Sequence, residues 1–349
     1  MNCYFLGGVT SEGFKTDFTE TIYSEEKFTY ILKGGPGTGK STIMKKIAET
    51  FSDSDDIDLY YCSSDENSLD AVVLNKKGVV IVDGTSPHVF DPMYPGVKQT
   101  IIHLGDFWNT DTLKKSEEEI IFATKNNSDW HKRCIRYITA LSSINSDIYS
   151  MGMYALNREK LIRFIERFVK KNIPDKKSGE GKLSFKKYSV MTKSGYIIQE
   201  IPYTKKFFLY DGLFAGSDFM LRKLEKCITE RGYDIIVSKC ELCNNALYEH
   251  LSVPELDMVF ISATPLNKIE PYAIKINFSR FYFRDKISEK KERIAFSKKA
   301  MSNLSDEAAD SMKKAKEIHD ILEEYYISAV DFDKINKLTD KLIKEIKKR

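Results

Sequence analysis

The sequence predicts an α/β protein in which a parallel sheet flanked by helices occurs twice in tandem. Three observations carry this prediction. A strand, a glycine-rich loop and a helix follow one another at residues 28–51, a second buried strand ends at Asp83, and the two halves of the chain repeat one pattern. The 349 residues are enough for two domains of roughly 100–200 residues, each with its own core.

Composition and charge describe an ordinary globular protein and indicate no partner. Hydrophobic residues make up 42% and charged residues 30% of the chain, and the net charge is +3. This balance carries no specific signal for nucleic acid or for a membrane surface. No run of about 18 apolar residues and no signal peptide are visible, so we expect a cytoplasmic protein whose six cysteines are reduced thiols.

The glycine-rich loop is the strongest motif in the chain. Residues 34–41 fit G-x-x-x-x-G-K-[ST] at every fixed position, between an apolar strand and an amphipathic helix. Glycines let backbone N–H groups converge on phosphate oxygens, and the helix N-terminus adds partial positive charge. The predicted nucleotide-binding residues are Gly34, Gly35, Pro36, Gly37, Thr38, Gly39, Lys40, Ser41 and Thr42. The alternative is a glycine turn that binds nothing.

Within this motif, Lys40 is expected to reach the β- and γ-phosphates of ATP, and the Ser41 hydroxyl to ligate Mg²⁺. A carboxylate for the same ion is expected at Asp83, where the apolar run 79–82 ends. The alternative for Asp83 is a simple Asp-Gly turn. No Glu follows Asp83, so hydrolysis is expected to be slow or assisted from elsewhere.

An internal repeat divides the chain into two copies of one domain. Sliding the sequence along itself aligns apolar positions and several identical residues in the following segments: 30–47 over 207–224, 79–87 over 258–265, and 101–120 over 275–294. The predicted domains are 1–172 and 183–349, joined by the hydrophilic stretch 171–182. Each is expected to end in a helical extension, at 112–171 and 286–349.

The second copy has lost the phosphate chemistry of the first. Ser217 takes the place of Lys40 and Asp218 that of Ser41, and the alignment puts Ile261 opposite Asp83. A carboxylate at 218 would repel a triphosphate. We therefore expect one competent nucleotide site, and a C-terminal half retained for shape, contact or regulation.

The same contrast between copies selects further candidate site residues, namely Asp65, Asp70, His88 and Asp106, with Thr85 as a possible sensor of the γ-phosphate. Asp65 and Asp106 follow predicted strands, where ligands bind in open α/β sheets, and we include both among the catalytic candidates with Lys40 and Asp83. The alternative for each is a surface side chain free to vary. Arg280 or Arg284 is a candidate arginine finger from the second half, with a plain surface arginine as the alternative.

The loop KGGPGTGKST, the segment VDGTSPHVFDPMYPG and the stretch HLGDFW together resemble a bacterial family of tandem P-loop ATP-binding proteins. Members of this family are described as ATPases, and in places as nucleotide kinases, without an assigned substrate. The resemblance covers nearly the whole chain. It implies a P-loop NTPase fold in both halves, with ATP at residues 34–41 and Asp83 beside it. Ser217 and Asp218 depart from members that carry a usable second loop.

The sequence therefore predicts a Mg²⁺-dependent ATPase with ATP as ligand and an unidentified small-molecule or protein partner. Two alternatives stay open. One is a small-molecule or nucleotide kinase, suggested by Asp83-Gly84. The other is a switch or scaffold in which ATP binding alters the contact between the halves and turnover is incidental.

Overall fold

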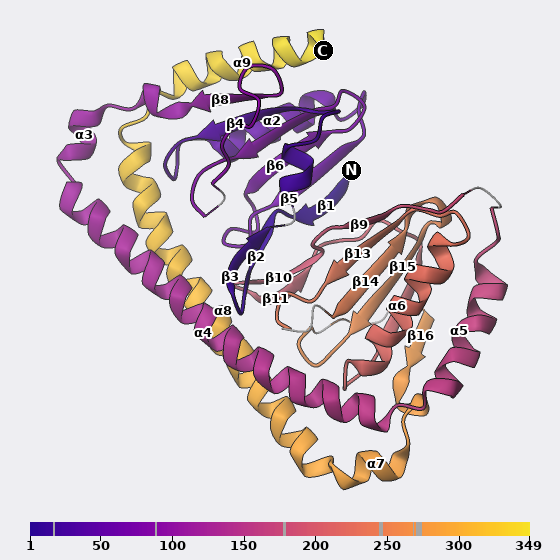
Figure 1. Cartoon of the computed structure of the whole chain (residues 1–349). Coiled ribbons are helices and arrows are strands. Elements are labelled where there is room, and N and C mark those ends of the chain that lie inside the picture. Colours follow the sequence, from indigo (N-terminus) through magenta and orange to yellow (C-terminus); the bar gives the residue numbers. More distant parts are fainter. Residues whose placement is uncertain (17, 88, 177–178, 244–246, 268, 270–273) are drawn as a thin grey trace.

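The computed structural model describes the chain from residue 1 to 349 except residues 17, 88, 177–178, 244–246, 268 and 270–273. It contains two six-stranded sheets, one in each half (Figure 1). In spatial order the first sheet is β1 (Asn2–Phe5), β5 (Ile57–Tyr61), β6 (Leu69–Leu74), β7 (Val79–Asp83), β4 (Phe28–Lys33) and β8 (Gln99–His103). The second is β9 (Leu183–Phe185), β13 (Ile235–Lys239), β14 (Tyr248–Val253), β15 (Met258–Ala263), β12 (Lys205–Tyr210) and β16 (Ile274–Asn277).

The two sheets have the same strand order relative to the chain, as the internal repeat requires. A two-stranded hairpin follows the first strand in each half, formed by β2 (Gly7–Thr10) with β3 (Gly13–Thr16) and by β10 (Ser189–Thr192) with β11 (Gly195–Ile198). The prediction of purely parallel sheets is wrong for one strand in each half. β6 and β14 run antiparallel to both neighbours, because short connections join each to the strands before and after it.

Alternating residues of the central strands face two different cores. On β4, Tyr30 and Leu32 pack with helix residues such as Met44, while Ile31 faces the other way. The Ile31 side belongs to a cluster that also contains Val259 of the second sheet. The helices that pack on the Tyr30 and Leu32 side therefore cover the outer face of the sheet, and the inner faces of the two sheets pack against each other. The predicted sheets flanked by helices are present in both halves, and together they form four layers.

Each half has one helix after its glycine-rich position and three after its last strand. The first group is α2 (Lys40–Phe51) and α6 (Ala215–Thr229). The helices after the sheets are α3 (Thr110–Lys114), α4 (Glu117–Ala155) and α5 (Arg158–Asn172) in the first half, and α7 (Arg284–Glu289), α8 (Lys291–Ile327) and α9 (Phe332–Lys348) in the second. The short helices α1 (Thr19–Ile22), η1 (Leu104–Phe107), η2 (Pro254–Leu256) and η3 (Phe278–Phe281) complete the fold.

The two halves exchange their last helices. The long helices α4 and α8 pack side by side in opposite directions and carry each chain segment to the other sheet (Figure 1). As a result α5 packs on α6 and η3 of the second half, and α9 packs on α2 and η1 of the first. Reciprocal bridges fix the crossing, since Leu156 pairs with Tyr282 and Trp108 with Val330.

Both exchanged helices begin with a side-chain cap. Asn157 accepts a hydrogen bond from the Lys160 N–H, and Asp331 accepts one from the Lys334 N–H. The six cysteines are free. Among the residues described, no helix is both long and apolar enough to cross a bilayer.

Candidate functional site

The glycine-rich loop connects β4 to α2 at the carboxyl end of the first sheet. Gly37 and Gly39 have φ values of +65° and +83°, which only glycine adopts readily, and Gly39 is the N-cap of α2. Gly39 has no side chain to cap the helix. Among the described residues, the N–H groups of Gly39 and Lys40 find no acceptor. Unpaired amides at a helix N-terminus are donors available for an anion.

Lys40 lies across this loop. Its Nζ donates to the carbonyl oxygens of Gly34 at 2.8 Å and Gly35 at 2.7 Å, and stands 3.5 Å from the Asp83 carboxylate. The Lys40 and Asp83 side chains are only 11% and 13% exposed. Because water screens such a pair poorly, the ammonium and the carboxylate interact strongly with whatever charge lies beside them.

Oxygen ligands gather at the same edge of the sheet. Asp83 ends β7 directly beside Leu32 of β4, and Asp70 on β6 is its neighbour in the antiparallel register. Burial raises the pKa of Asp83 above its usual value against the opposing charge of Lys40, and Asp70 raises it further. The Ser41 hydroxyl lies close by, accepting the Leu69 N–H at 2.9 Å. A hydroxyl with two carboxylates is a donor set that suits Mg²⁺.

The other sequence candidates are placed at different distances from this centre. Thr85 donates through both its N–H and its hydroxyl to Asp83, so it orients that carboxylate. His88 lies outside the described residues. Asp106 is exposed on η1 and bonds to His103, 2.9 Å away. None of the described contacts joins Asp106 to the loop.

Asp65, which follows β5, is connected to the second half of the chain. Its carboxylate accepts from Ser68 and lies 3.5 Å from Lys316 of α8. Burial acts to raise its pKa, but the Ser68 hydrogen bond and the Lys316 charge together hold the pKa of Asp65 below its usual value. Asp65 is therefore an ionised partner of α8.

The end of α8 covers the loop. A Cβ placed on Gly35 would lie 2.7 Å from the Tyr326 ring, and one on Gly37 would lie 2.9 Å from the Glu323 carbonyl oxygen. Glycine at these positions is thus required by the close approach of α8. The sequence did not predict this contact, because it arises from the exchange of helices between the halves.

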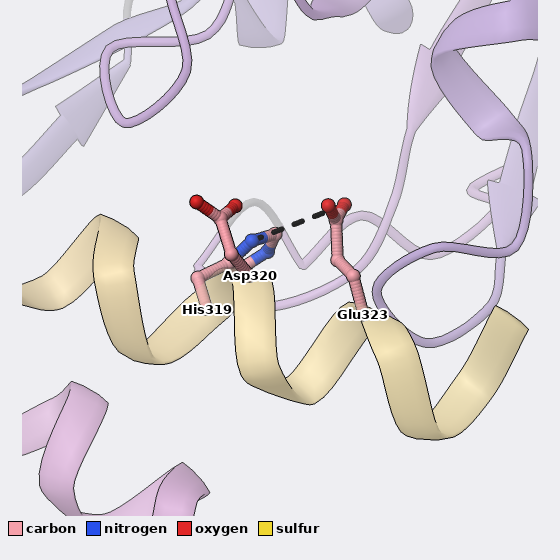
Figure 2. Close-up of side chains that lie close together, drawn as sticks. All are labelled: His319, Asp320 and Glu323. Carbon is pink, nitrogen blue, oxygen red and sulfur yellow. Dashed lines mark ion pairs between the residues drawn. The ribbon is translucent and has the colours of Figure 1, made fainter.

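Four charged or titratable side chains of α8 lie over this region, and none was predicted from the sequence: Lys316, His319, Asp320 and Glu323. Figure 2 shows His319, Asp320 and Glu323 pointing to one side of the helix, and the His319 Nδ1 is 3.9 Å from the Glu323 carboxylate. Ligand atoms of these three residues lie within 4.8 Å of one another. Burial lowers the pKa of His319, which favours its neutral form.

The equivalent positions of α4, over the second loop, carry no charge. The reciprocal bridges show which positions of the two helices are equivalent. Lys316 corresponds to Ser142, His319 to Asn145, Asp320 to Ser146 and Glu323 to Tyr149. This comparison between helices is the sequence signal that would have found the α8 residues. It becomes visible only once α4 and α8 are known to cover opposite loops.

The second loop is filled by its own carboxylate. Asp211, at the position of Gly34, is 2% exposed and accepts hydrogen bonds from the N–H groups of Leu213, Gly216 and Ser217 and from the Tyr282 hydroxyl. Gly216 and Ser217 are the counterparts of Gly39 and Lys40. The amides that are unpaired in the first loop are therefore satisfied internally in the second. Burial raises the pKa of Asp211 against these donors.

Asp218 takes over the structural contact of Ser41 without its chemistry. It accepts the Tyr248 N–H at 2.9 Å, as Ser41 accepts that of Leu69. Its charge is held by Arg222 at 2.9 Å and by the Tyr149 hydroxyl at 3.0 Å. The predicted replacements at 217 and 218 thus lie where the sequence placed them.

Two residue pairings between the copies are wrong by one position. Strand register pairs Leu32 with Asp83 and Leu209 with Ser262, so Ser262, and not Ile261, corresponds to Asp83. Likewise Asp70, which the sequence alignment placed opposite Tyr248, corresponds to Glu249; because Glu249 is also acidic, the contrast that selected Asp70 does not hold. The cause is a connection one residue longer in the second half, 240–247 against 62–68.

Arg280 does not reach the first loop. Its guanidinium lies 4.7 Å from the Phe164 ring and 4.6 Å from the Phe281 ring, against α5 in the second half. Arg284 begins α7, at the end of the molecule away from α2 (Figure 1). The chain matches no protein-family model, no curated protein and no solved structure.

Proposed function

We propose that the chain is a P-loop NTPase that binds Mg²⁺·ATP at residues 34–42 and hydrolyses it, with the C-terminal half as a pseudo-NTPase. The contrast between the two loops carries this proposal. The amides of Gly39 and Lys40 have no acceptor within the described chain, whereas their counterparts donate to Asp211. A triphosphate would occupy in the first loop the place that a carboxylate occupies in the second.

The proposed chemistry is positioning and charge neutralisation. The loop amides and Lys40 hold the phosphate oxygens, and Lys40 exchanges its bonds to the Gly34 and Gly35 carbonyls for bonds to phosphate. Ser41 and Asp83, with Asp70 beside them, would hold Mg²⁺, which withdraws charge from the phosphates. Thr85 keeps the Asp83 carboxylate oriented.

The second half supplies what the first lacks. No Glu follows Asp83, but the backbone of Glu323 on α8 lies against Gly37, and the Glu323 carboxylate lies 3.9 Å from neutral His319. We assign Glu323 to orientation of the attacking water, a role suited to a carboxylate. Lys316 and Asp65 hold α8 in place across the halves. Asp106 has no part in this proposal.

The test measures phosphate release and nucleotide affinity in the full chain. Lys40→Ala should reduce turnover by about 10²–10³-fold or more, since it removes a donor to the developing charge. Asp83→Asn should act in the same direction through the metal. The matched control Ser217→Ala, at the lysine position of the second loop, should leave turnover unchanged.

Turnover surviving in Lys40→Ala would refute the nucleotide site. Phosphate release that appears only when a nucleoside or nucleotide acceptor is added would refute hydrolysis and assign a kinase instead. Nucleotide binding without turnover under either condition would assign a switch.

A further inference from the structure

A groove of about 630 Å³ lies in the second half, far from the first loop, between α5, the edge strand β16 and η3. Five basic side chains line it, from three separate elements: Lys160, Arg167, Lys171, Lys275 and Arg280. Among the described residues, no acidic side chain lines the groove, and none of the five cations forms an ion pair. Uncompensated positive charge in a concave surface attracts anions strongly.

Aromatic rings form the floor of this groove. Phe164, Phe168, Phe207 and Phe281 contribute to its lining. Phe164 and Phe281 pack at 5.2 Å between ring centroids, and the Arg280 guanidinium stacks over both. Lys160 Nζ is bonded to the Arg280 carbonyl oxygen at 2.8 Å, which ties the two walls together. Phe207 and Phe281 are only 5% and 2% exposed, so the rings that a ligand would meet beside the charges are those of the half-buried Phe164 and Phe168.

The basic and aromatic residues of α5 form one stripe along the helix. Lys160, Phe164, Arg167, Phe168 and Lys171 follow the spacing of one helical face. At 1.5 Å per residue the stripe extends over roughly 16 Å. Such a length offers cations to several successive phosphates, and a single phosphate group would use only part of it.

The equivalent positions of the first half do not carry the same charge. Between α9 and η1 the equivalents of Lys171, Lys275 and Arg280 are Glu345, Ile101 and Asp106. Only Lys160 and Arg167 have basic equivalents, Lys334 and Lys341. The Lys341 Nζ is 3.9 Å from the Glu345 carboxylate. Leu338 and Leu342 replace Phe164 and Phe168. Within the described part of the chain, five cations without an ion pair in the groove thus correspond to two lysines and two carboxylates at the equivalent positions of the first half.

We propose that the groove between α5 and β16 binds a short stretch of single-stranded nucleic acid, with phosphates on the five cations and bases against Phe164 and Phe168. Single-strand binding sites combine a basic groove that follows the backbone with aromatic side chains that stack on bases. The near-neutral charge of the whole chain conceals this site because its cations come from two segments more than a hundred residues apart in sequence.

The experiment uses the full-length chain and fluorescein-labelled oligothymidine and oligouridine of about 12 nucleotides, within the site size of single-strand binding folds. Binding is followed by fluorescence anisotropy between about 50 and 200 mM salt, with affinity falling about 0.7 log units per log unit of salt for each phosphate contact. Saturating Mg²⁺·ATP keeps the first loop occupied.

The double variant Lys171→Glu/Arg280→Asp gives the groove the residues of its counterpart. It should weaken oligonucleotide binding by about tenfold or more and lower the salt slope. Phe164→Leu, also taken from the counterpart, should weaken binding about fivefold through lost stacking. Thermal melting identifies any variant that fails to fold. If the double variant does not fold, Phe164→Leu alone still tests the site.

The matched control is Lys334→Glu/Lys341→Glu, which makes the same change in net charge on the other half. It should bind the oligonucleotides like the unaltered chain. Equal affinity in the groove variant and the unaltered chain would overturn the proposal. So would competition by AMP as effective as that by the oligonucleotide, or equal binding of polyglutamate. ATP turnover should be unchanged in the groove variant, so the outcome is independent of the proposed ATPase activity.

Discussion

The two loops at the glycine-rich positions of this chain occupy the same place in their respective sheets, but only the second contains a buried carboxylate. In the first, Gly34 leaves the amides of Gly39 and Lys40 without an acceptor among the residues that the structure describes. In the second, Asp211 fills that space and takes the equivalent amides. The comparison teaches that one residue at the end of a strand can decide whether a loop needs an external anion or supplies its own.

The strongest way to break this comparison is to give the first loop the carboxylate of the second. The double variant Gly34→Asp/Thr38→Ala introduces the residues that the second loop has at the equivalent positions, Asp211 and Ala215. The second change is needed because a Cβ at 34 would lie 2.8 Å from the Thr38 hydroxyl. Loss of two charge-assisted hydrogen bonds should weaken ATP binding by at least about a hundredfold. Calorimetric titration measures it, and Thr38→Ala alone is the control.

Removing the internal carboxylate tests the second loop. Asp211→Ala leaves three amides and the Tyr282 hydroxyl without their buried acceptor. The free energy of unfolding should fall by about 2–4 kcal/mol. Urea denaturation measures it. Asp106→Ala removes an exposed carboxylate whose pairing with His103 is worth little, and should change stability by less than about 0.5 kcal/mol. Equal effects of the two substitutions would contradict the role given to Asp211.

The helices over the loops differ in charge, and Glu323→Gln tests that difference. If Glu323 orients water, kcat should fall about 10²-fold or more while ATP affinity stays the same, because a neutral amide holds and polarises the attacking water less strongly than a carboxylate. The neighbouring Glu324→Gln, an exposed position, serves as the control. Steady-state kinetics and nucleotide titration separate the two quantities. A loss of affinity with unchanged kcat would assign Glu323 to binding instead.

The smallest effect concerns Glu249, the counterpart of Asp70. Burial raises the pKa of Glu249 to about 7, so the folded protein holds a proton that the unfolded chain releases near its usual, lower pKa. Stability from this group is therefore complete below that lower pKa and is lost as pH rises toward 7. His250, 3.5 Å away, stays neutral across this range because burial lowers its pKa to about 3.

Glu249→Gln removes this titration. Between about pH 5 and pH 7 the unaltered chain should lose up to about 1.4 kcal/mol per pH unit relative to the variant. Urea denaturation at a series of pH values gives the difference directly. Parallel pH profiles for the two proteins would show that Glu249 is already ionised in the folded state.

Local patterns predicted the centre of the site. The strand before Gly34, the helix after Gly39 and the carboxylate at Asp83 all follow from hydrophobic runs and one motif. The register error at Ile261 arose because sequence similarity does not locate a single inserted residue in a connection. The antiparallel direction of β6 was missed because a buried strand has the same apolar pattern in either direction.

The α8 residues could not be predicted for a different reason. A helical pattern shows which face of α8 is apolar, but not which sheet it covers. That choice depends on the path of α4 and α8 between the halves. The sequence therefore gave no reason to select Glu323 and His319. It suggested Arg280 as an arginine finger, although Arg280 lies beside α5 in the second half. Long-range exchange is invisible to any argument from spacing alone.

The reciprocal placement of α5 and α9 also determines how the molecule responds to cutting. Proteolysis between residues 172 and 183 would sever the backbone. The two fragments would still be held together, because the last helix of each packs on the sheet of the other. Separately expressed pieces, in contrast, would each lack the cover that the other provides. The covalent link thus ensures that the two halves, each of which needs a helix from the other, are always made in equal amounts.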